Sequence, residues 1–205
     1  MLNLHEHKIG VMDESDEANE LFLKKRFADA LRKYELALQI EPDNLVALNN
    51  KGYSLSKLKK YSEALSCYDE SLRKNPRDKL VLVNKISTFR KIGEFDKALR
   101  ICEELLENTP NDRIVLYHKM RIFKKLERFS ESNIICDKLL DDYPTNGEVL
   151  YDMASNFLKI GDEMSFFSTL QKAVTEMPNL KNKSKNNVEF EQFRNNERFL
   201  KIIHE

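Results

Sequence analysis

The chain has 205 residues, and its 34 Lys and Arg residues are balanced by 34 Asp and Glu residues. A net charge of zero provides no overall field to collect nucleic acid or an anionic membrane, so neither is an expected partner. The composition, 33% charged and 41% apolar, is typical of a helix-rich chain with a thin core, and no apolar run is long enough to span a bilayer.

The first ten residues, MLNLHEHKIG, lack the basic and apolar regions of a secretory signal, so we expect a cytoplasmic protein. His5 and His7 flank a glutamate in this segment. A histidine pair in a terminal tail is weak evidence for a metal site, and we predict none.

The five prolines recur at a constant interval of 34 residues, at Pro42, Pro76, Pro110, Pro144 and Pro178. So regular an interval indicates an internal repeat. Five copies of 34 residues occupy residues 11–180, which leaves no room for a separate catalytic domain.

Residues 45–78 show what one copy contains. Apolar residues recur at helical spacing in two stretches, separated only by the polar pair Lys59–Lys60, so two antiparallel helices are predicted. Proline ends the second helix, because it lacks an N–H and keeps the preceding residue out of the helical region. Two residues after each of the first four prolines stands a good helix N-cap: Asn44, Asp78, Asp112 or Asn146.

These copies resemble the tetratricopeptide repeat family. The second copy carries the small pair Gly52 and Ala64, the aromatics Tyr53, Tyr61 and Tyr68, and Pro76. The resemblance implies an all-α fold, a right-handed superhelical α-solenoid of antiparallel helix pairs, with the first helix of each pair lining the concave side. Ile86 and Met120 fill the position of Gly52, which predicts wider helix spacing in the later repeats.

The predicted domain organisation follows the repeat. It comprises an N-terminal extension (1–10), five repeats (11–44, 45–78, 79–112, 113–146 and a divergent 147–180), a polar linker (181–187) and C-terminal capping helices (188–205). The last segment has apolar residues at helical spacing: Phe190, Phe193, Phe199, Ile202 and Ile203. A solenoid needs a cap over its last apolar face, so capping is favoured over docking on a partner.

No residue pattern in the sequence indicates a catalytic, metal or cofactor site. Cys67, Cys102 and Cys136 lie on apolar faces of second helices without a close-spaced pair, so we interpret them as small buried hydrophobic residues. Glycine-rich phosphate loops are missing, and His118 has no Cys or Ser at catalytic spacing nearby. We therefore expect no catalytic residue, no metal, no cofactor and no enzymatic activity.

The predicted concave groove is more informative, because it combines aromatic and basic residues. Its candidate ligand contacts are Asn49, Tyr53, Lys57, Ser87, Arg90, Lys91, Tyr117, Arg121, Lys124, Lys125, Tyr151 and Lys159. Tyrosines offer rigid contacts of the kind that dominate binding sites. The lysine row (Lys57, Lys91, Lys125 and Lys159) keeps the interval of 34 residues. Alternatively, each lysine only complements the dipole at the end of its helix.

One subfamily of co-chaperones grips a C-terminal carboxylate with lysine, asparagine and arginine on successive first helices. Asn19 and Asn50 fit that pattern, but Ser15, Leu80 and Asn84 stand where it needs basic residues. The carboxylate clamp is therefore not predicted.

The leading hypothesis is a protein-interaction scaffold that binds a peptide segment of acidic character from another protein. Alternatives are a single-stranded nucleic acid in the basic groove and self-assembly through the solenoid ends. Residues 13–20, DESDEANE, are a candidate internal ligand for the groove of a neighbouring molecule. The sequence identifies neither the partner nor the oligomeric state.

Overall fold

The computed structural model describes residues 14–204, and every element in that range is a helix. The described part of the chain divides after Glu94 into two compact units, unit 1 up to this residue and unit 2 from Phe95 onward. The predicted all-α solenoid class is confirmed, because consecutive helices pack in pairs within each unit. No helix of the described range is long and apolar enough to cross a membrane.

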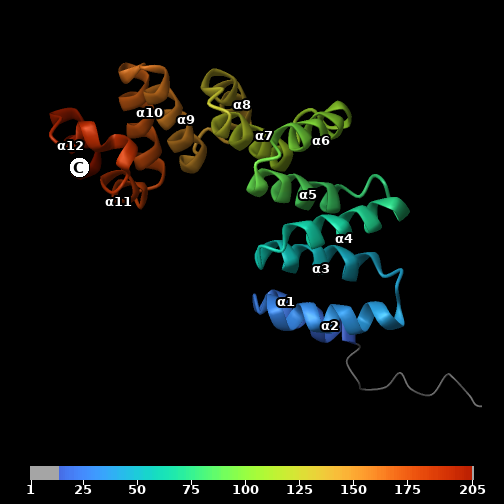
Figure 1. Ribbon diagram of the computed structural model, residues 1–205. Helices are drawn as coiled ribbons and strands as arrows, with labels where there is room; N and C mark the ends of the chain where they lie inside the picture. Colours follow the sequence, from blue (N-terminus) through green and yellow to red (C-terminus); the bar gives the residue numbers. More distant parts are fainter. Residues whose placement is uncertain (1–13, 205) are drawn as a thin grey trace, which may run out of the picture. The chain divides into compact units, whose positions relative to one another are not determined.

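Unit 1 contains α1 (Glu14–Leu23), α2 (Phe27–Ile40), α3 (Leu45–Lys57), α4 (Tyr61–Lys74) and α5 (Lys79–Ile92). Each helix packs on the next one in the chain, and the first helices of successive pairs also touch, α1 with α3 and α3 with α5. Figure 1 shows these helices stacked in chain order, from blue to green. The first helices therefore form a continuous face within unit 1.

Unit 2 contains α6 (Phe95–Asn108), α7 (Arg113–Lys125), α8 (Phe129–Asp142), α9 (Gly147–Ile160) and α10 (Glu163–Glu176). The chain continues through α11 (Leu180–Lys185), the 3-10 helix η1 (Val188–Phe193) and α12 (Glu197–His204). The last helix packs against both α10 and α11. In Figure 1 these elements run from green to red.

The four predicted N-caps are confirmed. Asn44 Oδ1 accepts a hydrogen bond from the backbone N–H of Ala47, and Asn146 Oδ1 accepts one from Val149. Asp78 and Asp112 each accept two hydrogen bonds, from the backbone N–H groups of the second and third residues of the helices that they cap. Each proline-containing junction therefore ends one helix and starts the next within a few residues.

At one buried position, a small residue on one helix of a pair is matched by a larger residue on the other helix, and which helix carries the small residue differs between pairs. A Cβ added at Gly52 would lie 2.6 Å from Cε1 of Tyr68, so the small residue on α3 makes room for the large one on α4. In α7 and α8 the order is reversed, because the buried Met120 is followed sixteen residues later by the small, buried Cys136. The prediction of wider helix spacing in the later repeats did not consider that a small residue on the partner helix can offset a large one.

The cysteines are buried, as predicted. Burial raises the pKa of Cys67, and it raises the pKa of Cys136 to about 12. Both thiols therefore stay protonated at neutral pH, where a thiolate would be the reactive form.

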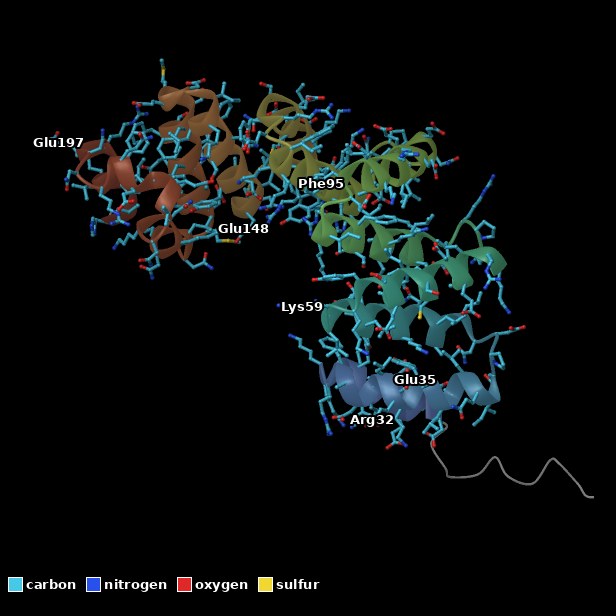
Figure 2. The ribbon with its side chains drawn as sticks, in the orientation of Figure 1. Arg32, Glu35, Lys59, Phe95, Glu148 and Glu197 are labelled. Carbon is cyan, nitrogen blue, oxygen red and sulfur yellow. The ribbon has the colours of Figure 1, made fainter. Side chains whose placement is uncertain are left out.

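The turn inside each helix pair contains one residue with a left-handed backbone. These residues recur every 34 positions, at Lys25, Lys59, Gly93, Glu127 and Gly161, with φ between 58° and 88°. Glycine adopts this conformation without penalty, whereas residues with a Cβ do so at a cost of about 1–2 kcal/mol. Figure 2 labels Lys59 at this turn, between α3 and α4.

The prediction of a polar linker at residues 181–187 is wrong for most of that segment, because α11 spans Leu180–Lys185. Leu180 and Ser184 lie four residues apart, on one face of the helix, and both are buried. Leu180 anchors this helix in the core of unit 2.

The C-terminal segment covers the last helix pair with aromatic side chains. Phe190, Phe193, Phe199, Ile202 and Ile203 are all buried in one cluster with residues of α9 and α10. The ring of Phe166 lies at its centre, with centroid distances of 5.0 Å to Phe190 and 5.1 Å to Phe193. Asn196 separates the two short helices and caps the second, since its Oδ1 accepts from the N–H of Phe199.

Two predictions concern the N-terminus. The extension 1–10, with the pair His5 and His7, lies outside the described residues, as does Asp13. The proposed internal ligand DESDEANE is not a separate peptide, because residues 14–20 belong to α1. Three of its acids, Glu14, Asp16 and Glu17, occupy the first turn, where negative charge suits the helix dipole. Lys33 pairs with Glu14 and Glu17 at 3.0 and 2.6 Å.

The left-handed turns generate a stability prediction. Lys59→Gly should raise the free energy of unfolding by about 0.5–1 kcal/mol, and Gly93→Ala should lower it by about 1 kcal/mol. The loss at Gly93 is expected from the backbone alone, because an added Cβ there meets nothing within 4 Å. Urea unfolding followed by circular dichroism measures both changes. Lys60→Gly is the control, since Lys60 has a φ of −85°, and an equal gain there would contradict the explanation.

The aromatic cluster generates a second one. Phe190→Ala should lower the free energy of unfolding by about 3–5 kcal/mol, because it opens a cavity beside Phe166. Val188→Ala is the matched control on the same 3-10 helix, where the side chain is 74% exposed and the loss should stay within about 0.5 kcal/mol. Equal losses for the two variants, measured by thermal and urea unfolding, would mean that the C-terminal segment does not stabilise unit 2.

Candidate functional site

The first-helix face of unit 1 is crossed by a row of hydrogen-bonded side-chain amides, which we call the amide row (Asn19, Asn50, Asn49 and Asn84). Asn84 Nδ2 donates to Asn49 Oδ1 at 2.9 Å, and Asn49 Nδ2 donates to Asn50 Oδ1 at 3.3 Å. Asn50 Nδ2 donates to Asn19 Oδ1 at 3.1 Å, and that oxygen also accepts from the hydroxyl of Tyr34 at 2.7 Å. The row links α1, α3 and α5.

A second polar connection leads to the lysines at the helix ends. Thr88 Oγ1 donates to the carbonyl of Asn84 at 3.0 Å, and it lies 3.0 Å from Ser56 Oγ. Lys91 Nζ donates to Ser56 Oγ at 3.1 Å. Because Thr88 already donates to a carbonyl, Ser56 donates to Thr88, and the three side chains form a directed chain.

Lys57 and Lys91 are exposed at the ends of α3 and α5, and no carboxylate within residues 14–204 forms an ion pair with either. Burial lowers the pKa of Lys91, and the charges of Lys57 and Arg90 lower it further. The two lysines therefore lie close enough to repel each other. Their positive charge is not balanced by this part of the protein.

Aromatic and apolar residues flank the polar rows of unit 1. The Tyr53 ring lies 5.2 Å from that of Phe22 and 6.0 Å from that of Phe27, and Lys57 Nζ lies 5.0 Å from the Tyr53 centroid. Ser87 and Arg90 lie half-buried on α5. Val46 and Leu80 are exposed in the first turns of α3 and α5. The face thus offers apolar side chains at one end of its helices and lysines at the other.

In unit 2 the basic residues of α7 are paired with an acid of α9. Asp152 is 7% exposed and accepts from Arg121 Nη1 at 2.9 Å and from Lys124 Nζ at 2.7 Å. Arg121 also donates to the hydroxyl of Tyr117 at 3.2 Å. Burial lowers the pKa of Arg121, but the charge of Asp152 and the hydrogen bonds outweigh this effect and leave that pKa raised.

A basic cavity of about 310 Å³ lies beside this ion-pair cluster. Four cationic side chains and three carboxylates line it together with Phe129: Arg121, Lys124, Lys125 and Lys159, with Glu127, Asp152 and Glu189. An apolar cavity of about 290 Å³ lies nearer the start of α7, where Ile114, Tyr117, Leu139 and Val149 contribute to its lining. Tyr117 lines the apolar cavity and Arg121 lines the basic cavity, and the two side chains are hydrogen-bonded to each other.

The prediction that Tyr151 contacts a ligand is wrong, because the C-terminal segment covers this side chain. Tyr151 is 4% exposed, its ring lies 5.6 Å from that of Phe190, and its hydroxyl accepts from Asn187 Nδ2 at 2.9 Å. Two further contacts hold the segment here. Lys183 pairs with Glu148 at 2.8 Å and Lys159 with Glu189 at 3.6 Å, and Figure 2 labels Glu148 near the start of α9.

Among the predicted contacts, the structure brings Asn49, Tyr53, Lys57 and Lys91 onto one face of unit 1, although Asn49 is largely buried in the amide row. In unit 2 it brings Arg121, Lys124, Lys125 and Lys159 around one cavity. Sequence reasoning missed Asp152 and Glu189. A signal for Asp152 existed, since it continues the 34-residue interval of Asn50 and Asn84. Glu189 lies outside the repeats and has no such signal.

Comparison with known proteins places this geometry in a family. The tetratricopeptide repeat is matched by two family models, one over residues 46–78 and one over residues 82–114. No curated protein sequence matches the chain.

Several solved structures share the fold at low sequence identity. A tetratricopeptide repeat protein from Parabacteroides merdae has a TM-score of 0.77 and 20% identity, covering 92% of this chain and 75% of that one. MamA from Desulfovibrio magneticus RS-1 has a TM-score of 0.72 and 16% identity, covering 87% of this chain and 100% of that one. YrrB, described as a TPR protein with an unusual peptide-binding site, has a TM-score of 0.65 and 17% identity, covering 84% and 89%. The two matched segments identify the chain as a tetratricopeptide repeat protein, and the solved structures share its fold.

Proposed function

We propose that this chain is a non-enzymatic scaffold that binds a peptide segment of acidic character from another protein. Binding of proteins and peptides is the usual role of the family. The proposed contacts in unit 1 are Tyr53, Lys57, Ser87, Arg90 and Lys91. Those in unit 2 are Tyr117, Arg121, Lys124, Lys125 and Lys159.

The observation that carries the proposal is the unbalanced charge of Lys57 and Lys91 beside the amide row. If each lysine only complemented the dipole of its own helix, the two would have no reason to lie close together on one face. Instead, the charge of Lys57 lowers the pKa of Lys91. Holding like charges together costs free energy, and a bound carboxylate would recover it. Amide side chains next to them can donate to and accept from a peptide backbone.

The apolar residues support a peptide rather than a free anion. Val46 and Leu80 of unit 1, and the apolar cavity beside Ile114 in unit 2, can each receive an apolar side chain of the ligand. YrrB, a TPR protein with an unusual peptide-binding site, offers a precedent in the same fold. A cytoplasmic location stays a prediction.

Single-stranded nucleic acid is the competing ligand, because basic surfaces with aromatic residues also suit phosphates and bases. The contacts of the tyrosines argue against it. Tyr151 is buried and cannot stack on a base. The half-buried Tyr53 ring already has the rings of Phe22 and Phe27 beside it, which leaves less of it for base stacking. Self-association stays an alternative that size-exclusion chromatography of the same samples distinguishes.

Charge reversal tests the proposal. The double variant Lys57→Glu/Lys91→Glu should bind a fluorescein-labelled poly-glutamate peptide about tenfold more weakly than the wild type, because two favourable contacts become repulsive. Fluorescence polarisation across a salt series measures this, and wild-type affinity should itself fall as salt rises. Labelled oligo-uridine, titrated at physiological salt, should bind more weakly than the peptide.

The matched control is Lys25→Glu/Arg77→Glu, which changes the net charge of unit 1 equally. Both residues are exposed, and Lys25 occupies the turn position that Glu127 occupies in a later repeat. Equal losses in the two double variants would show a non-specific charge effect and refute a site at Lys57 and Lys91. Tighter binding of oligo-uridine would favour the nucleic-acid alternative.

The pKa of Lys91 provides a test that needs no ligand. Lys57→Gln should raise that pKa, because it removes one of the two charges that lower it, while the lowering by burial remains. Titration of the lysine Nζ and Cε resonances by NMR measures the shift. Lys25→Gln is the control and should leave the Lys91 pKa unchanged. An unchanged pKa in Lys57→Gln would mean that the two lysines are independent.

A further inference from the structure

The basic cavity of unit 2 differs from the lysine pair of unit 1 because it already contains an anion of the chain itself. Glu189 of η1 lines the cavity, and its Oε1 lies 3.6 Å from Lys159 Nζ. We propose that this cavity is a subsite for a carboxylate side chain of the bound segment, and that Glu189 is a built-in competitor for it. The inference rests on the proposed function and adds one subsite and its regulation.

Two of the basic side chains of the subsite, Arg121 and Lys124, are already held in place without a ligand. Asp152 is buried and holds Arg121 and Lys124 by short charged hydrogen bonds of 2.9 and 2.7 Å. Charge-assisted bonds of this kind keep long side chains in one geometry. With two cations against one carboxylate, the cluster keeps a net positive charge that faces the cavity.

The rim of the subsite is adjustable. Lys125 is exposed and forms no ion pair with any carboxylate of the described range. Lys159 pairs only loosely with Glu189, since the side chains remain 44% and 38% exposed and the atoms are 3.6 Å apart. Exposed pairs of this kind contribute little free energy, so a carboxylate on a ligand can replace that of Glu189.

Within residues 14–204, Glu189 forms no other ion pair or side-chain hydrogen bond that would hold its carboxylate in place. Its backbone N–H is bonded to Asn187 Oδ1 at 3.0 Å, which fixes the main chain of η1. Phe190, the next residue, is buried in the aromatic cluster. The main chain is therefore held while the carboxylate is free to leave Lys159. Displacement needs only a side-chain rotation, and the C-terminal segment stays in place.

The charges lining the cavity determine the direction of the expected effects. The cavity is lined by four positive and three negative side chains, so its net charge is about one positive charge. Removing the charge of Glu189 raises this net charge to about two. Glu189→Gln should therefore tighten binding of the poly-glutamate peptide about two- to fivefold, and Lys159→Gln should weaken it by a similar factor. A merely structural contact between Lys159 and Glu189 predicts no gain on removing one partner.

The test measures binding of the labelled poly-glutamate peptide to the full chain by fluorescence polarisation, with thermal unfolding to show that each variant folds. Glu191→Gln is the matched control, because Glu191 lies on the same 3-10 helix, loses the same charge and pairs instead with Arg194 at 3.2 Å. It should change affinity less than Glu189→Gln. In the double variant Glu189→Gln/Lys159→Gln, the gain from Glu189→Gln should be reduced or lost.

The outcomes separate this inference from the proposed function. Equal affinities for Glu189→Gln and Glu191→Gln would overturn the competitor, and unchanged affinity in Lys125→Gln/Lys159→Gln would overturn the subsite. If charge reversal at Lys57 and Lys91 still weakens binding in those cases, the scaffold function stands without it. If neither set of variants changes binding of the acidic peptide, both proposals fail.

Discussion

A pair of short helices exposes more apolar surface than it can bury alone, so each pair of this chain is stable only with a neighbour packed against it. Inside the units the next helix pair is that neighbour. After α10 the neighbour is assembled from the smaller pieces α11, η1 and α12. Two phenylalanines of η1, Phe190 and Phe193, pack on the ring of Phe166. The same requirement explains the tight junctions, since a proline and an N-cap two residues later bring the next pair into place without a loop.

Covering that last surface also determines the electrostatics of the candidate site. Lys57 and Lys159 occupy the same position of their repeats. Among the residues that the structure describes, only Lys159 has a carboxylate paired with it, because η1 places Glu189 there. Likewise, Arg121 and Lys124 are held by an aspartate, whereas the equivalent region of unit 1 contains an amide row. One repeat pattern therefore produces an unbalanced basic face in unit 1 and a nearly balanced cavity in unit 2.

Much of the fold could be predicted from the sequence because it rests on local rules. The prolines, the N-caps and the apolar periodicity each act within a few residues, and they correctly placed the helix starts at Leu45 and Lys79 and the buried cysteines. The segment KNKSKNN reads as a linker by composition, but tertiary burial of Leu180 and Ser184 makes most of it helical.

The candidate site was harder to predict, because its properties depend on side chains that meet across helices. The periodicity placed Tyr151 on the first-helix face, but only the structure shows Asn187 and Phe190 covering it. The ion pairs of Asp152 join residues 28 and 31 positions apart, a separation that follows from neighbouring first helices. No local pattern reveals that Lys57 and Lys91 lack a carboxylate partner among residues 14–204.

The exchange of side-chain size across the helix pairs has a consequence for how such a gene can recombine. Gly52 requires a large partner such as Tyr68, whereas the equivalent buried pair in α7 and α8 is Met120 and Cys136. A crossover at a proline junction moves each matched pair as a whole and keeps its volume. A crossover inside a helix pair would join Met120 to a tyrosine or Gly52 to a cysteine, which overfills the core in one product and leaves a cavity in the other. Duplication and shuffling of these repeats are therefore tolerated at the prolines and selected against between the two helices of a pair.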